Sequence, residues 1–328
     1  MPQSFRLSRR IARLRALVAV MLVLGLAACD KSEAFNPDNS ITPDAADQGP
    51  MLGAEEPEIV QVSEVSGPTL ASATFSGGIP FGTFQQPVTT FGGRYNGTKL
   101  TVGPSALMSA LSGAKSRGGK VALMLAGNHR YYQDAGGRFS LTKWKARIDR
   151  FKNLKFDSYI NDGTVIGHFM MDEPNDPTNW NGQPVPPSMI EEMARYSKQL
   201  WPNMPTIVRV EPGYLSQNHR YLDAAWAQYL ARRGPVGDYI RRVVSDAQQR
   251  GLGLVVGLNF MDGGTPNGTK MTPSEVESWG SALLSSSYPC AFISWQYNST
   301  YLTSSGIGSA MDALRRKAEN RGTKSCRG

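Results

Sequence analysis

From residue 69 onwards, the apolar residues fall into short continuous runs that alternate with longer amphipathic segments. Runs such as KVALMLAG and VIGHFMMD are typical of strands that are buried on both faces of a parallel sheet. A run with several alanines, LDAAWAQYL at 222–230, fits either a strand or a helix. The remaining runs predict strands at 71–84, 120–127, 165–173, 206–211, 253–260 and 290–297.

The amphipathic segments carry apolar residues three and four positions apart, as a helix that covers a sheet requires. Ser188, followed by Glu191, has the spacing of a capping box at a helix start. In contrast, FGGRYNGTKL at 91–100 contains the pair Asn96-Gly97 and is typical of a loop with a turn. Helices are predicted at 104–116, 142–156, 188–201, 236–250, 275–284 and 308–319.

Strand, loop and helix alternate throughout this region, which predicts an α/β fold with a parallel sheet. Seven or eight strands in about 260 residues is the size of a single-domain (β/α)8 barrel of the TIM type. A doubly wound open sheet is the alternative, but the chain has neither a GxGxxG fingerprint after its first strand nor a P-loop. We therefore expect a (β/α)8 barrel over residues 69–328.

The amino terminus has the features of an export signal. Five arginines precede an apolar run of 13 residues at 16–28, which is too short to span a bilayer comfortably, so residues 1–28 are predicted to be a signal peptide. The run ends in LAAC, which resembles the lipobox of bacterial lipoproteins and implies that Cys29 carries a lipid. An ordinary secretory signal with an unrelated cysteine is the alternative. A lipid would hold the exported protein in the cell envelope, at the periplasmic face of the inner membrane or at the outer membrane.

The charge of the chain is unevenly distributed. The formal net charge is +8, yet residues 29–68 hold nine acidic residues and one lysine, which predicts a flexible acidic tether. Residues 69–328 hold 29 basic and 18 acidic residues. The chain has no basic runs interleaved with aromatic residues, so the excess of basic residues is interpreted as a solvent-exposed surface. No nucleic-acid partner is expected.

Four acidic residues lie at or just beyond the ends of predicted strands: Asp172, Glu173, Glu211 and Asp262. In α/β barrels the C-terminal ends of the strands carry the active site. Hydrolysis of a glycosidic bond needs two carboxyl groups, one to protonate the leaving oxygen and one to act as nucleophile or to activate water. These four acids are therefore the candidate catalytic residues.

Side-chain alternation assigns faces to some of these acids. In TIVRVE, Arg209 and Glu211 share a face, and a charged arginine favours the barrel interior over the helix layer. Glu211 is therefore predicted to point into the site, where it could pair with Arg209. In the strand at 165–173, His168 and Asp172 share one face and Glu173 lies on the other, so alternation leaves open which acid enters the site.

Three short motifs carry a resemblance to a known family. DEP at 172–174, the loop residue Trp180 and SWQYN at 294–298 resemble bacterial TIM-barrel glycoside hydrolases and related glycosidase-like lipoproteins. The resemblance implies that Glu173 is the acid/base and that Trp295 is a platform on which a sugar stacks.

Two features depart from the pattern of that family. Asp172 stands where an asparagine is common, and the strand expected to bring a glutamate nucleophile ends instead in Asn259 and Asp262. The partner of Glu173 is therefore either Asp262 or Glu211.

The sequence thus predicts a glycoside hydrolase that acts on O-glycosyl bonds of a polysaccharide or oligosaccharide. The alternative is a non-catalytic carbohydrate-binding barrel lipoprotein that lacks a working acid pair. The three histidines have no metal-ligand spacing, so neither a metal nor a cofactor is expected. Polar and aromatic residues near the strand ends are the predicted sugar contacts: Asn128, His129, Tyr131, Trp180, Arg209, Asn259, Trp295, Gln296 and Tyr297.

Beyond Cys29, the chain has two cysteines, Cys290 and Cys326. In an oxidising compartment an even pair favours a disulfide. Such a bond would tie the C-terminal tail to the last strand, and two separate thiols are the alternative.

Overall fold

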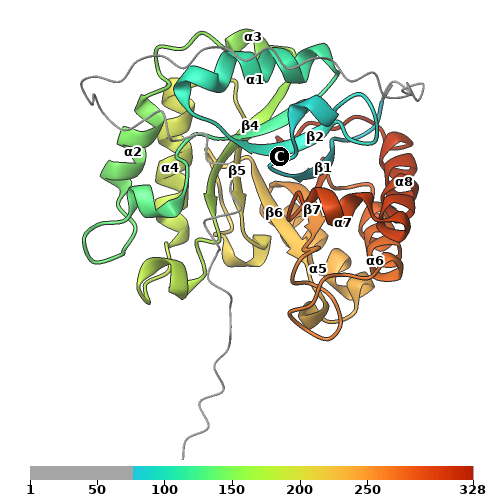
Figure 1. The fold of residues 1–328 in the computed structure, drawn as a ribbon. Helices are drawn as coiled ribbons and strands as arrows, with labels where there is room; N and C mark the ends of the chain where they lie inside the picture. The colour runs from blue at the N-terminus through green and yellow to red at the C-terminus, as the bar shows by residue number, and fades with distance from the viewer. Residues whose placement is uncertain (1–76, 328) are drawn as a thin grey trace, which may run out of the picture. The chain divides into compact units, whose positions relative to one another are not determined.

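A computed structural model describes residues 77–327. Eight parallel strands follow one another around a closed barrel, and the last strand pairs with the first (Figure 1). Helices surround the barrel, and none of those described is long and apolar enough to cross a membrane. The predicted (β/α)8 architecture is confirmed. The predicted signal peptide, Cys29 and the tether lie outside the described residues.

Each strand buries most of its side chains, as the continuous apolar runs predict. The alanine-rich run at 222–230 forms a strand, because Trp226 packs inside the barrel while Ala225 and Ala227 pack against the helices. The strands are β1 (Phe81–Phe84), β2 (Gly97–Thr101), β3 (Lys120–Met124), β4 (Val165–Asp172), β5 (Thr206–Arg209), β6 (Ala224–Tyr229), β7 (Gly253–Leu258) and β8 (Ala291–Ser294).

Strand β2 lies within the segment 91–100 that the sequence predicts to be a loop. Gly97 opens β2 where β1 passes so close that an added Cβ would lie 2.8 Å from the backbone nitrogen of Phe81. Asn96 Oδ1 accepts a hydrogen bond from the same nitrogen at 2.7 Å. The loop prediction holds for 91–96 and is wrong for 97–100, because Gly97 serves close strand packing and not a turn.

The long helices coincide with the amphipathic segments of the sequence. The predicted helix at 142–156 is the exception, because it ends at Asp149 and residues 150–156 form turns and an irregular segment. The helices are α1 (Pro104–Ser116), α2 (Leu141–Asp149), α3 (Asp157–Asn161), α4 (Pro187–Leu200), α5 (Val236–Gln249), α6 (Pro273–Ser285), α7 (Ser299–Thr303) and α8 (Ser305–Glu319). Short 3-10 helices lie in the loops: η3 (Val88–Thr90), η4 (His129–Tyr132), η5 (Pro177–Trp180), η6 (Pro212–Tyr214) and η7 (Ala231–Arg233).

The capping box predicted for Ser188 and Glu191 is wrong. The N-cap of α4 is Pro186, which makes no side-chain cap. The Glu191 carboxylate instead accepts hydrogen bonds from the backbone nitrogens of 220–222 at 2.7 to 3.3 Å, so it ties the loop before β6 to α4. A capping box does form at the start of α6, between Thr272 and Glu275.

Two apolar layers hold the barrel together. The inner layer fills the barrel with side chains such as Phe84, Phe169 and Ile207. The outer layer lies between strands and helices and includes Leu111 and Val243. Each fully buried side chain of this size stabilises the fold by roughly 1.5–3 kcal/mol.

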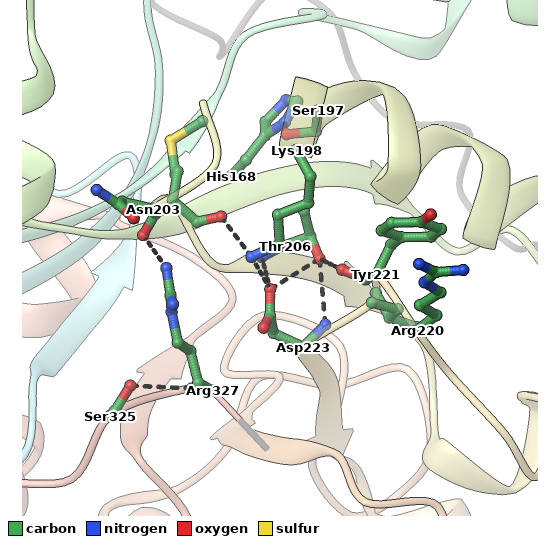
Figure 2. Close-up of polar contacts among 12 residues, drawn as sticks. His168, Ser197, Lys198, Asn203, Thr206, Arg220, Tyr221, Asp223, Ser325 and Arg327 are labelled. Atoms are coloured by element: carbon green, nitrogen blue, oxygen red, sulfur yellow. Dashed lines mark hydrogen bonds and ion pairs between the residues drawn. The ribbon is translucent and has the colours of Figure 1, made fainter. Parts of the chain in front are cut away.

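His168 belongs to the outer layer despite its polarity. Its ring stacks on Trp144 at a centroid distance of 5.8 Å and meets the edge of Trp201 at 6.0 Å. Its Nδ1 forms a 2.8 Å hydrogen bond with the hydroxyl of Ser197 on α4 (Figure 2). Burial lowers the pKa of His168 to about 3, so the ring is neutral and has a structural role.

The C-terminal tail is fixed at the N-terminal ends of the strands. Cys290 and Cys326 form a disulfide with their Cα atoms 5.2 Å apart. The guanidinium of Arg327 donates a hydrogen bond to the backbone carbonyl oxygen of Asn203 (Figure 2). The tail also passes so close to Gly253 that an added Cβ there would lie 2.6 Å from the Cys326 carbonyl oxygen. The tail is therefore part of the folded domain.

Replacing both cysteines, Cys290→Ser with Cys326→Ser, is expected to destabilise the barrel. The bond links residues with a sequence separation of 36, and loop-closure entropy for a ring of this size corresponds to roughly 3–4 kcal/mol. Chemical denaturation at pH 7 measures the difference, and reduced wild-type protein gives an independent route to the same open state. Unchanged denaturation midpoints in both samples would contradict a stabilising disulfide.

Candidate active site

Aromatic side chains close the barrel interior below its C-terminal mouth. Phe84 meets Phe169, Trp226 and Trp295 edge-on, with ring centroids 5.6, 4.9 and 5.5 Å away. Phe84, Phe169 and Trp226 are buried, whereas Trp295 is partly exposed. Trp295 follows β8 and is fixed by two backbone hydrogen bonds to the β7 side, and the peptide bond that follows it is cis. Trp295 therefore forms the accessible part of an aromatic floor.

Arg209, the last residue of β5, lies on this floor. Its guanidinium carbon is 5.6 Å from the ring centroids of both Phe84 and Trp295. Nη1 donates a 3.0 Å hydrogen bond to Gln228 Oε1 on β6. Arg209 is only 8% exposed, and a guanidinium removed from water requires negative partners.

Both acids of the DEP motif supply those partners. Arg209 Nε lies 2.5 Å from Asp172 Oδ1, and Arg209 Nη2 lies 2.5 Å from Glu173 Oε1. The Asp172 side chain is 27% exposed and that of Glu173 is 47% exposed. One buried cation therefore holds two carboxylates at the mouth, and Glu173 is the more accessible of the two.

An irregularity in β4 brings Asp172 to the inner face. The pairing of β4 with β5 shifts register between Phe169 and Met171. Phe169 points into the barrel and Met171 into the helix layer, and Asp172 then pairs with Arg209. The carbonyl oxygen of Met170, at the bulge, accepts a 3.0 Å hydrogen bond from Trp144 Nε1 of α2.

Because of this bulge, side chains along β4 do not alternate between the two faces as the sequence analysis expects. His168 and Asp172 were predicted to share a face, but His168 packs outward and Asp172 lies at the mouth. A β-bulge adds one residue to a strand and reverses the side on which later side chains fall. Asp172 therefore reaches the site together with Glu173.

The backbone of Glu173 is held in an uncommon conformation. Its φ angle is +41°, in the left-handed region that non-glycine residues rarely adopt. Its nitrogen donates to the Arg209 carbonyl oxygen at 3.0 Å, and its own carbonyl oxygen accepts from Trp180 Nε1 at 3.2 Å. Such conformations cost on the order of 1–3 kcal/mol and cluster at functional sites.

Lys99 on β2 lies beside these residues. Its Nζ is 5.1 Å from the Phe84 ring and 5.3 Å from the Phe169 ring, and it donates a 3.1 Å hydrogen bond to Thr101 Oγ1. Lys99 is 6% exposed. Its pKa falls to about 8 because burial disfavours the ammonium, an effect that the charge of Asp172 opposes only in part. We use the name mouth cluster for Lys99, Asp172, Glu173, Arg209 and Gln228.

The mouth cluster changes the acidity of Asp172. Desolvation raises the pKa of this carboxyl to about 6, and the negative charge of Glu173 acts in the same direction. The charges of Arg209 and Lys99 oppose the rise without cancelling it. Near neutral pH a fraction of the molecules therefore holds a proton on Asp172.

The structure places Glu211 away from this site, which corrects the prediction that it shares the face of Arg209. Strand β5 ends at Arg209, and η6 begins at Pro212, so alternation no longer applies at Glu211. Its carboxylate lies 2.7 Å from Arg242 on α5 and 3.1 Å from Arg233 on η7. Glu211 therefore forms a peripheral ion pair network.

Asp262 lies in the loop after β7 and is exposed. Its backbone nitrogen donates to Asn259 Oδ1 at 3.1 Å, which makes Asn259 a turn-forming residue. Neither of the two partners predicted for Glu173, Glu211 and Asp262, contacts Arg209 in the structure. Asp172 contacts Arg209 together with Glu173.

The predicted sugar contacts after β3 and β4 have several different environments. Asn128 caps η4 by accepting from the backbone nitrogen of Arg130, and Tyr131 is 44% exposed and stacks with Arg147. His129 is half-buried against Trp180, and burial lowers its pKa. Trp180 is fully buried and also contacts aromatic rings on the η4 side, so its role is packing.

After β8, Trp295, Gln296 and Tyr297 are all partly buried at the mouth. Lys99 was not among the predicted site residues, because the segment that contains it was expected to form a loop. Gln228 was also overlooked, although AAWAQY places it on the same face as Trp226 once β6 is a strand. Within residues 77–327, no group of three or more His, Cys, Asp or Glu residues is arranged to hold a metal ion.

No protein-family model matches the chain, and no curated protein is similar to it in sequence. Its fold is similar to a glycoside hydrolase family 5 mannosidase from Rhizomucor miehei, at 10% identity and a TM-score of 0.50, over 73% of this chain and 93% of that chain. It is also similar to a GH18 chitinase from Pseudoalteromonas aurantia, at 11% identity and a TM-score of 0.44, over 71% and 99%. Both neighbours are glycoside hydrolases, and at 10% identity the similarity to the mannosidase shows the fold alone.

Arg209→Met is expected to destabilise the protein by about 3–5 kcal/mol at pH 7, because two carboxylates would lose their buried cation. Arg209 opposes the rise in the pKa of Asp172, so without the arginine this pKa rises further, and the loss is largest at high pH and shrinks as Asp172 takes up a proton. Chemical denaturation at pH 7 and pH 5 measures this loss in the free energy of unfolding. Arg242→Met is the matched control, since Glu211 keeps Arg233 and the change should cost less than about 1 kcal/mol. Equal losses for the two variants would contradict the central role of Arg209.

Asp172→Asn is expected to change how stability depends on pH. The folded-state pKa of about 6 exceeds the unfolded value of about 3.9, so the proton on Asp172 stabilises the wild type fully below pH 4. This contribution is lost as the pH rises through 6. The free energy of unfolding of the variant minus that of the wild type should therefore increase by roughly 2 kcal/mol from pH 4 to pH 7. A flat or falling difference in denaturation series would refute the raised pKa.

Proposed function

We infer that this protein is a glycoside hydrolase that cleaves O-glycosidic bonds in an oligosaccharide or polysaccharide at the mouth cluster. The observation that carries this proposal is the pair of carboxylates, Asp172 and Glu173, held on one buried guanidinium above an aromatic floor. Two carboxyl groups are the chemical requirement for glycoside hydrolysis. The position of the pair at the C-terminal ends of β4 and β5 is where barrel enzymes carry their active sites.

Asp172, and not Glu173 as the resemblance implies, is assigned proton transfer to the leaving oxygen, because its raised pKa of about 6 lets a fraction of the molecules hold a proton there near neutral pH. Glu173, the more exposed acid, is assigned the role of second carboxyl group. Arg209 keeps both oxygens in place and balances the charge that develops on them.

The aromatic floor provides a surface for a sugar ring. Trp295 is partly exposed, meets Phe84 edge-on, and has the guanidinium of Arg209 over its ring at 5.6 Å from the centroid. An aromatic face in this setting offers apolar area to the C–H face of a sugar, while neighbouring polar groups bind its hydroxyls. Gln228, which is hydrogen-bonded to Arg209, and Lys99, whose Nζ lies 5.1 Å from the Phe84 ring, are two such polar groups.

Carbohydrate binding without turnover is the second candidate. Asp172 and Glu173 are consecutive residues of one strand end, so they approach a bound sugar from the same side. The two carboxyl groups of a glycosidase normally flank the scissile bond. Glu211 and Asp262, which the sequence offered for the opposite side, do not reach Arg209.

A panel of glycans tested with wild type, Glu173→Gln, Asp172→Asn and Asp262→Asn separates these candidates. For hydrolysis we expect turnover by the wild type, a loss of about 10²–10⁴-fold in the first two variants, and wild-type rates in Asp262→Asn. Product analysis and calorimetric binding provide the measurements. Equal turnover by wild type and Asp172→Asn would refute the acid assignment. Binding that needs Trp295, with no turnover by the wild type, would favour the second candidate.

A further inference from the structure

A cavity of about 670 Å³ opens at the N-terminal ends of the strands, opposite the mouth cluster. Residues that begin or precede β1, β3, β4 and β5 form its base, and they include Pro80, Lys120, Val165 and Pro205. This cavity takes no part in the proposed chemistry. Its occupant can therefore be considered independently of the proposed function.

The C-terminal tail forms one wall of this cavity. Ser325, Cys326, Arg327 and Asn203 line it, and Figure 2 shows the side chain of Arg327 directed at Asn203. The disulfide from Cys326 fixes this wall to the start of β8. The cavity is thus bounded on this side by a covalently fixed segment.

The charged groups of the cavity are mostly positive and lack acidic partners. Lys324 Nζ donates to the Tyr288 carbonyl oxygen at 2.8 Å, and Arg327 likewise binds a backbone oxygen. Lys120 makes no ion pair with any residue of the described part of the chain. The acidic residue of the lining, Asp162, is already paired with Lys115 at 2.8 Å. Three cations around apolar residues therefore favour an acidic, partly apolar ligand.

The chain itself contains a segment of this composition. Residues 55–65, EEPEIVQVSEV, combine four glutamates with Ile59 and three valines. The next residues lead directly to Gly77 and Gly78, which line the cavity. About eleven intervening residues span up to roughly 36–40 Å, so the segment can fold back without strain. Tethered at the rim, it has an effective concentration in the millimolar range.

We propose that residues 55–65 dock in the cavity at the N-terminal end of the barrel, with their glutamates on Lys120, Lys324 and Arg327. The apolar side chains of the segment then cover the apolar base around Pro80 and Val165. The acidic tether acts as an internal counter-charge for a domain with an excess of basic residues. Docking shortens the free length of chain between the barrel and the predicted lipid on Cys29. The mouth cluster, at the opposite end of the barrel, stays open.

Carbodiimide crosslinking of the full chain, read by mass spectrometry, tests the docking. Lys120 and Lys324 should be joined to glutamates of 55–65 about tenfold more often than exposed Lys270 is, and about 1 M salt should remove the preference. Glu58→Lys with Glu64→Lys should abolish these crosslinks. The matched control, Asp38→Lys with Asp44→Lys, should retain them. Equal crosslinking to Lys120 and Lys270 would overturn the proposal.

Two further measurements exclude other occupants. A mixture of isotopically light and heavy protein distinguishes crosslinks within one chain from those between chains, and crosslinks predominantly between chains would assign the cavity to a second copy. Hydrogen exchange should show slower amide exchange at 59–65 than at 36–46 if the segment is docked. Equal, fast exchange in both regions would overturn the proposal. Each outcome is independent of glycan turnover, so it stands or falls separately from the proposed function.

Discussion

The mouth of this barrel depends on the burial of one guanidinium. Arg209 is nearly inaccessible, and removing such a charge from water costs several kcal/mol unless opposite charges and hydrogen bonds compensate. Gln228 and the two acids of the DEP motif provide that compensation from neighbouring strands. Because the compensation must come from two adjacent residues, β4 has to deviate from regular pairing, and Glu173 has to adopt a left-handed backbone. The geometry of the site follows from this electrostatic requirement.

The sequence was sufficient for the architecture because buried parallel strands and amphipathic helices have distinct periodicities. It also located the two acids at the end of β4. The sequence was insufficient wherever one local feature changed which face of a strand a side chain occupies, or whether a segment is a strand at all. The bulge near Met170 reversed the faces of β4, and the end of β5 at Arg209 removed Glu211 from the strand. A glycine required by close strand contact hid β2 and, with it, Lys99. None of these features has a periodic signal in a single sequence.

Burial affects two titratable residues of β4 in different ways. His168 lies among tryptophans of the outer layer, where no charge is near, and it avoids the cost of desolvation by remaining neutral. Asp172 lies four positions later on the inner face, next to Arg209 and Lys99. There the desolvation cost is offset only in part, which leaves the carboxyl between its two protonation states near neutral pH. The same strand therefore carries His168, which has a structural role, and Asp172, which has a proposed role in chemistry.

The two ends of the barrel differ in where their cations find negative partners. At the mouth, cations and carboxylates from adjacent strands neutralise one another within the fold. At the N-terminal end, Lys120, Lys324 and Arg327 find no carboxylate among residues 77–327, while the preceding segment of the chain is strongly acidic. In the proposed docking, the preceding segment supplies the counter-charge without any constraint on the register of the strands. It also leaves the chemistry at the mouth unaffected, since the strands separate the two ends by their full length.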